Sequence, residues 1–293
     1  MTGSVRAAVM MGMSLLTTGA GAQPGFGEDI DPSSARLISG TEALVAGAVN
    51  TLGLAFELEA GWHLYFDGQN DTGFAPDPGI ECPEGWELLS VEQPVPERYV
   101  AAGSLLDHVL EGAPVLLLRV RVPEHAAGQT VSLTGNSSWL VCKEACLMDD
   151  EEIELDIPVV ASGTEVRPSS DADSIAQAER ANAGPAPRAE AGLVVPEWLE
   201  TSWEGETVSL SAIGEAREAW DDGWRIEFYP GAGSAFIENL LRTGSSGNET
   251  LSLRAEAGPG KESAPVRGVV ALRSKKGVRY ASWIQLNRTE GEP

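Results

Sequence analysis

The stretch Trp139-Leu140-Val141-Cys142-Lys143-Glu144-Ala145-Cys146-Leu147-Met148 contains two of the three cysteines of the chain, separated by three residues. Apolar, β-prone residues at 131–133 and 139–141 precede the pair, and the alternating run 153–157 follows it. Alternation of apolar and polar residues with a period of two is typical of a half-buried strand. The stretch therefore predicts two antiparallel strands with the cysteines at or near the turn.

Backbone geometry decides whether Cys142 and Cys146 can form a disulfide. Residues four apart in one straight strand are separated by roughly 13 Å, whereas bonded cysteines need Cα atoms within about 7 Å. A three-residue hairpin loop at 143–145 would bring them to about 4.5 to 5.5 Å, and a helical turn would also place them on one face. Such a bridge closes a small ring and constrains little of the unfolded chain. Spacing alone therefore leaves both a structural and a redox-active disulfide open.

Three segments of the chain resemble the N-terminal periplasmic domain of the DsbD/ScsB-type thiol:disulfide interchange proteins. Residues 139–146 match its W-L-V-C-K-x-x-C signature. The other two segments, at 61–76 and 83–98, are similar to its G-W-H-x-Y-W-x-N-P-G-D-S-G-x-P and P-x-G-W…P-x-P-x-R segments. The chain departs from the pattern at Phe66, where the family often has Trp, and at 67–69, which replace an asparagine-proline run.

This resemblance implies an immunoglobulin-like domain in which Cys142 and Cys146 exchange electrons with partner proteins. In the family, a loop with an aromatic residue caps the cysteine pair and excludes unwanted oxidants and reductants. The candidates for this cap, and for acids that tune proton transfer near the sulfurs, lie close together in the chain: Tyr65, Phe66, Asp67, Asp71 and Phe74. The alternative is that the aromatic residues belong to the core or an edge and that the aspartates form turns.

Thiol–disulfide exchange proceeds by thiolate attack on a disulfide sulfur, and a second cysteine resolves the mixed disulfide that results. Lys143 should favour the thiolate, whereas the acidic residues Glu144 and 149–152 should disfavour it. We therefore expect the reduced thiols to react slowly until a partner docks. This chemistry needs no cofactor, and none is predicted.

The resemblance also implies partners. It predicts a relay of electrons between a membrane-embedded thiol reductant transporter and thioredoxin-like extracytoplasmic proteins, an activity of the protein-disulfide reductase type. The chain has no C-x-x-C thioredoxin-like segment and no membrane-spanning run after its first residues. We therefore expect those parts to be separate chains.

Two other classes of function fit the same residues. Two cysteines with a histidine elsewhere can bind copper(I) or zinc. No Met-rich or His-rich cluster accompanies the pair and its spacing is not that of a zinc finger, so we predict no metal site. The other alternative is a non-catalytic β-sandwich adaptor with a structural disulfide. The third cysteine, Cys82, is either a buried small apolar residue or a thiol for an intermolecular bridge.

Residues 1–22 predict an export signal. Arg6 precedes the apolar run 7–16, and the small residues at 20–22 are typical of a cleavage site. The apolar run is shorter than the about 20 residues that span a bilayer, and the alternative is an apolar N-terminal helix of the folded protein. We expect a periplasmic or otherwise extracytoplasmic protein, soluble after signal cleavage. Its formal net charge of −24 excludes nucleic-acid binding by bulk electrostatics.

The rest of the chain predicts an all-β fold with two immunoglobulin-like antiparallel β-sandwich domains joined by a partly helical linker. Residues 30–160 are predicted as the redox domain, 161–192 as the linker, and 193–288 as a second β-domain for support or docking. In the linker, residues 171–174 predict the cap of a helix at 175–181. The predicted strands are 43–58, 61–65, 79–83, 86–91, 115–122, 131–133, 139–141, 153–160, 207–211, 224–229, 250–254, 266–272 and 278–286.

Overall fold

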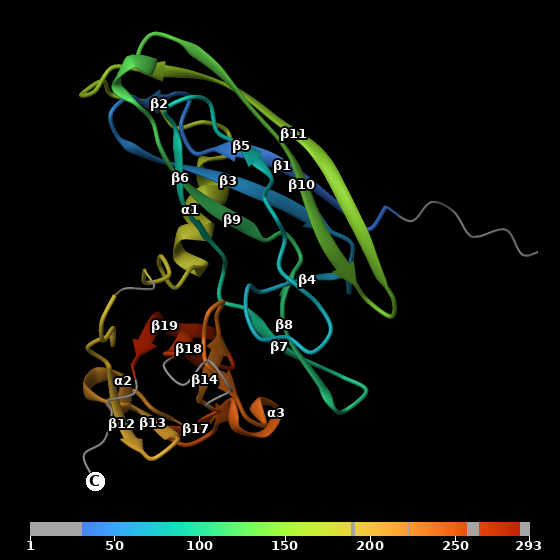
Figure 1. The fold of residues 1–293 in the computed structure, drawn as a ribbon, viewed down its shortest axis with the longest axis vertical. Helices are drawn as coiled ribbons and strands as arrows, with labels where there is room; N and C mark the ends of the chain where they lie inside the picture. The colour runs from blue at the N-terminus through green and yellow to red at the C-terminus, as the bar shows by residue number, and fades with distance from the viewer. Residues whose placement is uncertain (1–30, 189–190, 222, 257–263, 288–293) are drawn as a thin grey trace, which may run out of the picture. The chain divides into compact units, whose positions relative to one another are not determined.

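The computed structural model describes residues 31–188, 191–221, 223–256 and 264–287. The predicted export signal, 1–22, lies outside the described residues. Strands make up most of the regular structure (Figure 1). Their sheets are antiparallel, with a short parallel pairing between β2 (Leu44–Val45) and β11 (Cys146–Val160). The prediction of an all-β, sandwich-like fold is confirmed.

Two sheets enclose the first core. One has the order β1-β3-β9-β6, and its strands span Ser33–Ser39, Val49–Leu58, Val115–Arg121 and Glu87–Glu92. The other has the order β2-β11-β10-β4-β8-β7, with β10 at Thr130–Cys142, β4 at His63–Tyr65, β8 at Leu105–Glu111 and β7 at Glu97–Ala101. The short strand β5 (Ile80–Glu81) pairs beside β10, and a 3-10 helix spans Glu124–Ala126. Alternating leucines of β3 and β9 fill this core with Phe56, whose ring meets Trp139 edge-on at 5.1 Å between centroids.

Strands β10 and β11 form one long hairpin that is paired along its whole length up to the two cysteines. The sequence predicts shorter strands here because 134–138 and 148–152 are mostly polar. In the structure both strands continue through these residues, because polar side chains of β11 form hydrogen bonds with the neighbouring sheet. Asp149 and Glu151 accept hydrogen bonds from β1, at 2.6 Å from a serine hydroxyl and 2.7 Å from a backbone N–H. The acidic run therefore covers the polar edge of β1.

A second group of strands occupies the C-terminal part of the described chain. One sheet has the order β12-β13-β17-β15, at Leu199–Glu204, Thr207–Ala212, Thr250–Glu256 and Phe236–Ile237. The other has the order β16-β14-β18-β19, at Ser245–Ser246, Arg225–Pro230, Val266–Ser274 and Gly277–Leu286. The short helices α2 (Gly214–Glu218) and α3 (Leu240–Thr243) complete this group. Alternating apolar residues of both sheets form a second core cluster, as the period-two pattern predicts.

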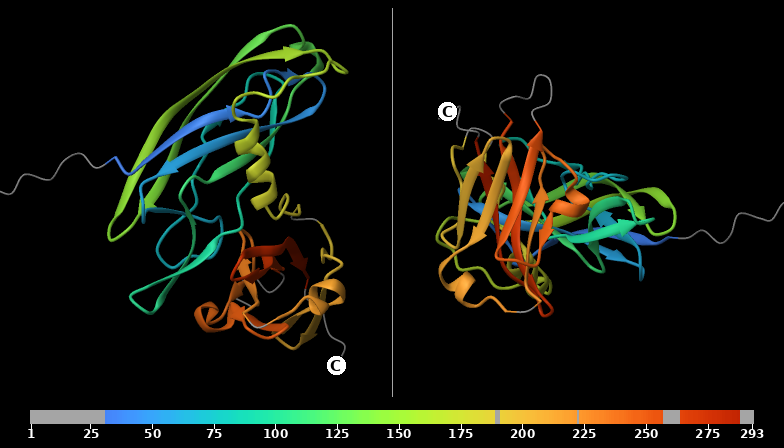
Figure 2. Two further views of the ribbon diagram at one scale, coloured as in Figure 1. Left: turned by 180° about the vertical axis from the view of Figure 1, so that it is seen from behind. Right: turned by 90° about the horizontal axis from the view of Figure 1, so that it is seen from below.

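Helix α1 (Ala172–Ala181) lies against β9 (Figures 1 and 2). Its buried residues Ile175 and Ala178 pack on the outer face of the first sheet, in a cluster with β1, β3 and β9. The helix begins close to the predicted position, but the predicted side-chain cap is wrong. Asp171 stands at the N-cap without a capping hydrogen bond. Its carboxylate instead accepts a hydrogen bond from Arg36 at 2.7 Å.

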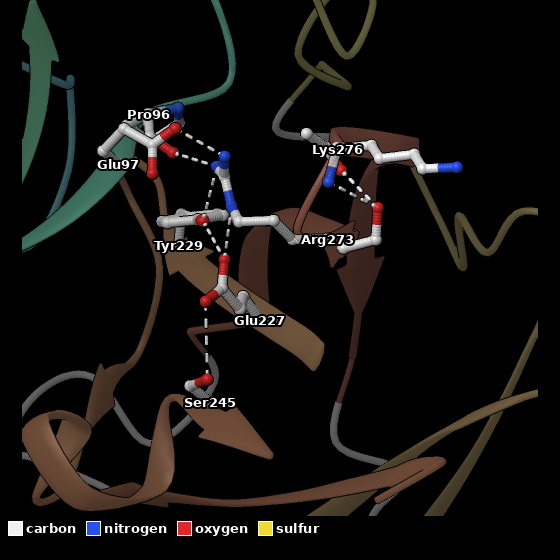
Figure 3. A network of polar contacts seen from close by, with 9 residues as sticks. Pro96, Glu97, Glu227, Tyr229, Ser245, Arg273 and Lys276 are labelled. Atoms are coloured by element: carbon white, nitrogen blue, oxygen red, sulfur yellow. Dashed lines mark hydrogen bonds and ion pairs between the residues drawn. The ribbon is translucent and has the colours of Figure 1, made fainter. Parts of the chain in front are cut away.

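The residues from Pro32 onwards form one compact unit, and polar contacts connect the two groups of strands within it. Arg273 of β18 donates to Glu227 at 2.9 Å, to the Pro96 carbonyl at 2.8 Å and to Glu97 (Figure 3). Strand β7 is thereby joined to β14 and β18. The predicted domain boundaries, 30–160, 161–192 and 193–288, remain a prediction.

Candidate functional site

Cys142 and Cys146 are joined by a disulfide at the closed end of the β10–β11 hairpin. They are directly opposite each other, with Cα atoms 4.1 Å apart, and residues 143–145 form the loop between them. The three-residue hairpin loop allowed by the spacing is the geometry found, rather than the helical turn.

The two cysteines of the pair differ in exposure. Cys142 is 3% exposed and packs in a small cluster with Leu140 and Tyr65. Its backbone also pairs with His63 of β4, so strands cover it on both sides. Cys146 begins β11 on the outer side of the hairpin and is exposed. A partner protein can therefore reach Cys146, whereas Cys142 lies inside the fold.

Tyr65 is the predicted cap residue for which a contact with the pair is recorded among the described residues. Its ring is buried, and its hydroxyl oxygen lies 3.8 Å from Cys146 Sγ and 3.2 Å from Thr72 Oγ1. Gly73 lies directly on the ring, because a Cβ built there would stand 2.2 Å from a ring carbon. Burial raises the pKa of Tyr65, so the phenol keeps its proton at neutral pH.

Asp107 of β8 organises the turn that faces Tyr65. It is 1% exposed. Its Oδ1 accepts hydrogen bonds from the N–H groups of Asp71 and Thr72 at 3.0 and 2.9 Å, and its Oδ2 accepts the Thr72 hydroxyl at 2.6 Å. Asp71, a predicted tuning residue, turns its own carboxylate to the Leu106 N–H at 2.7 Å. Asp71 therefore stabilises the turn through its hydrogen bond with Leu106. Asp107 is connected to Tyr65 by the Thr72 hydroxyl.

Phe66 and Asp67, which directly follow β4, contact residues of the C-terminal strands and the turn after β14. Phe66 is buried, and its ring stacks on Trp283 at 6.1 Å between centroids, in a cluster with Tyr229. Burial raises the pKa of the Asp67 carboxyl, and the nearby Arg267 partly opposes this. The structure thus brings these two predicted residues to the C-terminal strands instead of the cysteines.

Phe74, the remaining aromatic candidate, is 54% exposed. It lines a cavity of about 460 Å³ together with Phe66, Val91 and Trp283. No hydrogen bond or ring contact to the cysteine pair is recorded for it in the described part of the chain.

Lys143 is anchored to the chain that leads into β4. Its ammonium donates to the Ala60 carbonyl at 3.0 Å, and its stem covers Gly61. Glu144 is exposed in the loop, whereas Asp149 and Glu151 are bound to β1. The acidic residues near the cysteines therefore lie in two places: Glu144 is exposed in the loop, and Asp149 and Glu151 are hydrogen-bonded to β1.

His63 and Tyr99 complete the surroundings of Tyr65. The His63 ring lies 5.4 Å from the Tyr65 ring and 4.7 Å from the Tyr99 ring, measured between centroids. Burial lowers the pKa of His63, and the nearby Glu111 opposes this shift. The imidazole is therefore neutral at pH 7 and packs as an aromatic ring beneath the site.

Asp107, Thr72 and Tyr99 were missed as site residues by reading the sequence. Thr72 lies inside a segment that resembles the family, but the sequence analysis predicts that its neighbour Asp71, rather than Thr72, tunes proton transfer near the sulfurs. Asp107 had one usable signal, because it is an acid in the middle of the mostly apolar strand Leu105–Glu111, where burial of a charge demands a partner. The identity of that partner, 35 residues earlier in the chain, is visible only in the fold.

Two further observations concern cysteine and metal chemistry. Cys82 is free and partly buried, and burial raises the pKa of its thiol. In the described ranges no group of three or more His, Cys, Asp or Glu residues is arranged to hold a metal ion. Within the same ranges no helix is long and apolar enough to cross a membrane.

Comparison with known proteins agrees with this geometry. Residues 34–158 match the family model of the thiol:disulfide interchange protein DsbD, N-terminal. The N-terminal periplasmic domain of ScsB from Proteus mirabilis has a similar fold, with a TM-score of 0.51 and 15% identity, over 90% of this chain and 96% of that one. No curated protein matches the chain significantly.

Two other solved structures are much less similar. An I-band fragment of titin has a TM-score of 0.18 at 9% identity, over 88% of this chain and 66% of its own. A DUF4466 family protein from Parabacteroides merdae has a TM-score of 0.21 at 12% identity, over 87% of this chain and 97% of its own. Scores this low support no conclusion on the fold. The family match, by contrast, covers the part of the chain that contains the disulfide hairpin, and the ScsB domain has a similar fold, so residues 34–158 are similar to the N-terminal domains of DsbD.

Proposed function

We propose that the protein is an exported thiol:disulfide interchange module. It relays electrons through Cys142 and Cys146 between a membrane-embedded thiol reductant transporter and thioredoxin-like extracytoplasmic proteins. The observation that carries the proposal is the disulfide, which closes a hairpin tip in the segment that matches the DsbD N-terminal family model and which includes the exposed residue Cys146. The predicted signal and the periplasmic origin of the similar ScsB domain support the location.

The exposure of the two sulfurs favours an order of events. A partner thiolate attacks Cys146 Sγ, the Cys142–Cys146 bond breaks, and its electron pair leaves on Cys142 Sγ. The partner's second thiolate then attacks the partner sulfur of the mixed disulfide and releases Cys146 as a thiolate. Two electrons have then moved from the partner dithiol to the cysteine pair, and the partner has become a disulfide. Delivery to an oxidised protein runs the same steps backwards, with Cys146 as the nucleophile.

The surface around the exposed sulfur suits a protein partner. Leu147 and Met148, which directly follow Cys146, are 37% and 63% exposed. Exposed apolar side chains beside a reactive group are typical of a docking surface. Tyr65 shields the buried side of the pair, so access is limited to the side that a partner covers. Lys143 holds the loop in place through Ala60.

The reduction potential of the pair tests the proposal. The protein without residues 1–22 is equilibrated in graded thiol buffers, the free thiols are trapped by alkylation, and the masses are read. A Cys82→Ser variant serves as the matched control, because it leaves the pair as the only thiols. A potential between roughly −180 and −270 mV is expected, since exchange proteins fall in that range.

A potential below about −300 mV would mark a structural bridge. The interchange function would then be wrong, and a β-sandwich adaptor with a structural disulfide would take its place.

A further inference from the structure

A chain of hydrogen bonds runs from the buried Asp107 to the exposed sulfur. Asp107 Oδ2 lies 2.6 Å from Thr72 Oγ1, Thr72 Oγ1 lies 3.2 Å from the Tyr65 hydroxyl, and that hydroxyl lies 3.8 Å from Cys146 Sγ. The residues come from β8, from the turn after β4, from β4 and from β11. They meet only in the folded protein.

The carboxylate sets the direction of this chain. Asp107 accepts three hydrogens, two from backbone N–H groups and one from Thr72, which is the behaviour of an ionised carboxylate. The Thr72 hydroxyl has one proton, which it donates in a hydrogen bond to Asp107. The Thr72 oxygen is therefore left as an acceptor for the Tyr65 O–H. Tyr65 has one proton as well, and two acceptors compete for it: Thr72 Oγ1 and Cys146 Sγ.

The state of the sulfur decides this competition. A disulfide sulfur is a weak acceptor, so the Tyr65 proton stays on the Thr72 side while the bridge is closed. A thiolate is a charged acceptor, and hydrogen bonds to charged groups are roughly twice as strong as neutral ones. The distance of 3.2 Å to Thr72 is long for a hydroxyl hydrogen bond, so little is lost when the proton turns away.

We propose that Asp107 and Thr72 are positioning residues for the Tyr65 hydroxyl. They keep the Tyr65 O–H hydrogen-bonded to Thr72 in the oxidised protein, and they let it donate a hydrogen bond to the Cys146 thiolate after reduction. The reduced thiolate is thereby stabilised by the Tyr65 O–H, for which Thr72 Oγ1 remains a competing acceptor. This inference deepens the proposed function and rests on it for its biological role, because it concerns the nucleophile of the exchange reaction.

Other charged and titratable groups also surround this chain. They are His63 beside the Tyr65 ring, Glu111 and Tyr99 near His63, Lys143 and Glu144 in the loop, and Asp71 in the turn. They are the same in all the variants compared below. Asp107→Asn also removes a buried negative charge, so Thr72→Val, which keeps that charge, shows what the hydrogen-bond chain contributes.

The test uses an Asp107→Asn variant, in which the direction of the chain reverses. Asp107 Oδ1 accepts two backbone N–H groups, so the amide oxygen of asparagine must take that place. The amide NH₂ then faces Thr72 and donates to it, and the Thr72 hydroxyl donates to the Tyr65 oxygen. The Tyr65 proton has lost its competing acceptor, and Cys146 remains as its partner.

The measurement is the pH profile of alkylation of Cys146 in the fully reduced protein, with the modified cysteine identified by peptide mass. Tyr65→Phe should move the midpoint of the profile up by about one pH unit, since it removes a hydrogen bond to a charged group. Asp107→Asn and Thr72→Val should move it down. Thr72→Ser, which keeps the hydroxyl, is the matched control and should leave it unchanged.

The double variant separates the proposal from simple loosening of the turn. In the Tyr65→Phe background, Asp107→Asn should lower the midpoint by less than it does when Tyr65 is present, because only the direct effect of the lost charge remains. Loosening would raise the alkylation rate at high pH in both backgrounds without moving the midpoint. If Asp107→Asn folds poorly, Thr72→Val supplies the same comparison.

An unchanged or upward midpoint in both Asp107→Asn and Thr72→Val would overturn the inference. So would a midpoint that falls equally with and without Tyr65. These profiles are independent of the reduction potential, so a structural disulfide would refute the proposed function while leaving the hydrogen-bond chain measurable.

Discussion

At the scale of single residues, the two cysteines have the same chemistry and different surroundings. Cys142 is 3% exposed, lies among apolar side chains and is covered by β4, whereas Cys146 is exposed at the start of β11. Buried thiols in apolar surroundings are unreactive, because the thiolate is the nucleophile and burial disfavours a charge. The assignment of attack to Cys146 follows from this difference.

Single-cysteine variants test the assignment. With Cys142→Ser, the alkylation rate of the remaining Cys146 in the native protein serves as the reference. With Cys146→Ser, the remaining Cys142 should react more than about tenfold more slowly, because its sulfur is shielded. Mass spectrometry of timed samples gives both rates. Equal native rates would contradict the assignment, and equal rates in denaturant provide the control that the shielding belongs to the fold.

At the scale of elements, helix α1 is part of the first sandwich and not a free connector. Ile175 and Ala178 pack on the outer face of β3 and β9. Gly53 of β3 makes room for them, since a Cβ there would lie 2.7 Å from the Ile175 Cδ1 atom. The helical pattern was visible in the sequence. Its docking was not, because the receiving surface depends on a glycine and two strands far away in the chain.

Truncation of Ile175 measures this docking. Ile175→Ala should lower the free energy of unfolding by about 2 to 4 kcal/mol, since it removes buried methyl groups and leaves a cavity. Gln177→Ala, on the exposed side of the same helix, is the matched control and should have little effect. Urea unfolding followed by circular dichroism gives both values. A loss no larger than that of the control would show that the helix is not packed as described.

At the scale of the whole molecule, polar groups connect the two groups of strands. Glu227 is 6% exposed and is held by Arg273 at 2.9 Å and by the Tyr229 hydroxyl at 2.6 Å (Figure 3). Arg273 continues to Glu97 and the Pro96 carbonyl of the first group. Burial, above all, raises the pKa of Tyr229, so this side chain acts as a donor throughout the physiological range.

Removing one partner of the buried Arg273–Glu227 ion pair should lower the stability of the protein strongly. Arg273→Met should destabilise the protein by about 3 to 5 kcal/mol, because it leaves the Glu227 carboxylate buried without its cation. The double variant Arg273→Met with Glu227→Gln should recover part of this loss. Arg167→Met, which breaks an exposed pair with Glu42, is the control and should change stability little. Thermal unfolding compares the four proteins, and an equal loss in the single and double variants would contradict the argument.

The sequence by itself determined the paired strands on either side of the cysteines and the fold class, and it left a helical turn open as a second geometry for the loop. Two alternating runs beside a three-residue loop specify the register of β10 and β11 locally, and the register brings Cys142 and Cys146 together. Local pattern also predicted most of the longer strands and helix α1. Where polar residues interrupted the pattern, as at 148–152, the predicted strand was too short, because the partners that stabilise those side chains belong to another sheet.

Only the tertiary structure decided which residues surround the sulfurs. In it, the Phe66 ring stacks on Trp283, and Asp107 is hydrogen-bonded to Thr72, which lies within hydrogen-bond distance of Tyr65. It also buried one cysteine and exposed the other. These outcomes depend on contacts between strands that are distant in the chain, and the period-two pattern of each strand carries no information about its partners across the fold. The sequence therefore identified the cysteine pair, and the packing of β4, β8 and β11 defined its environment.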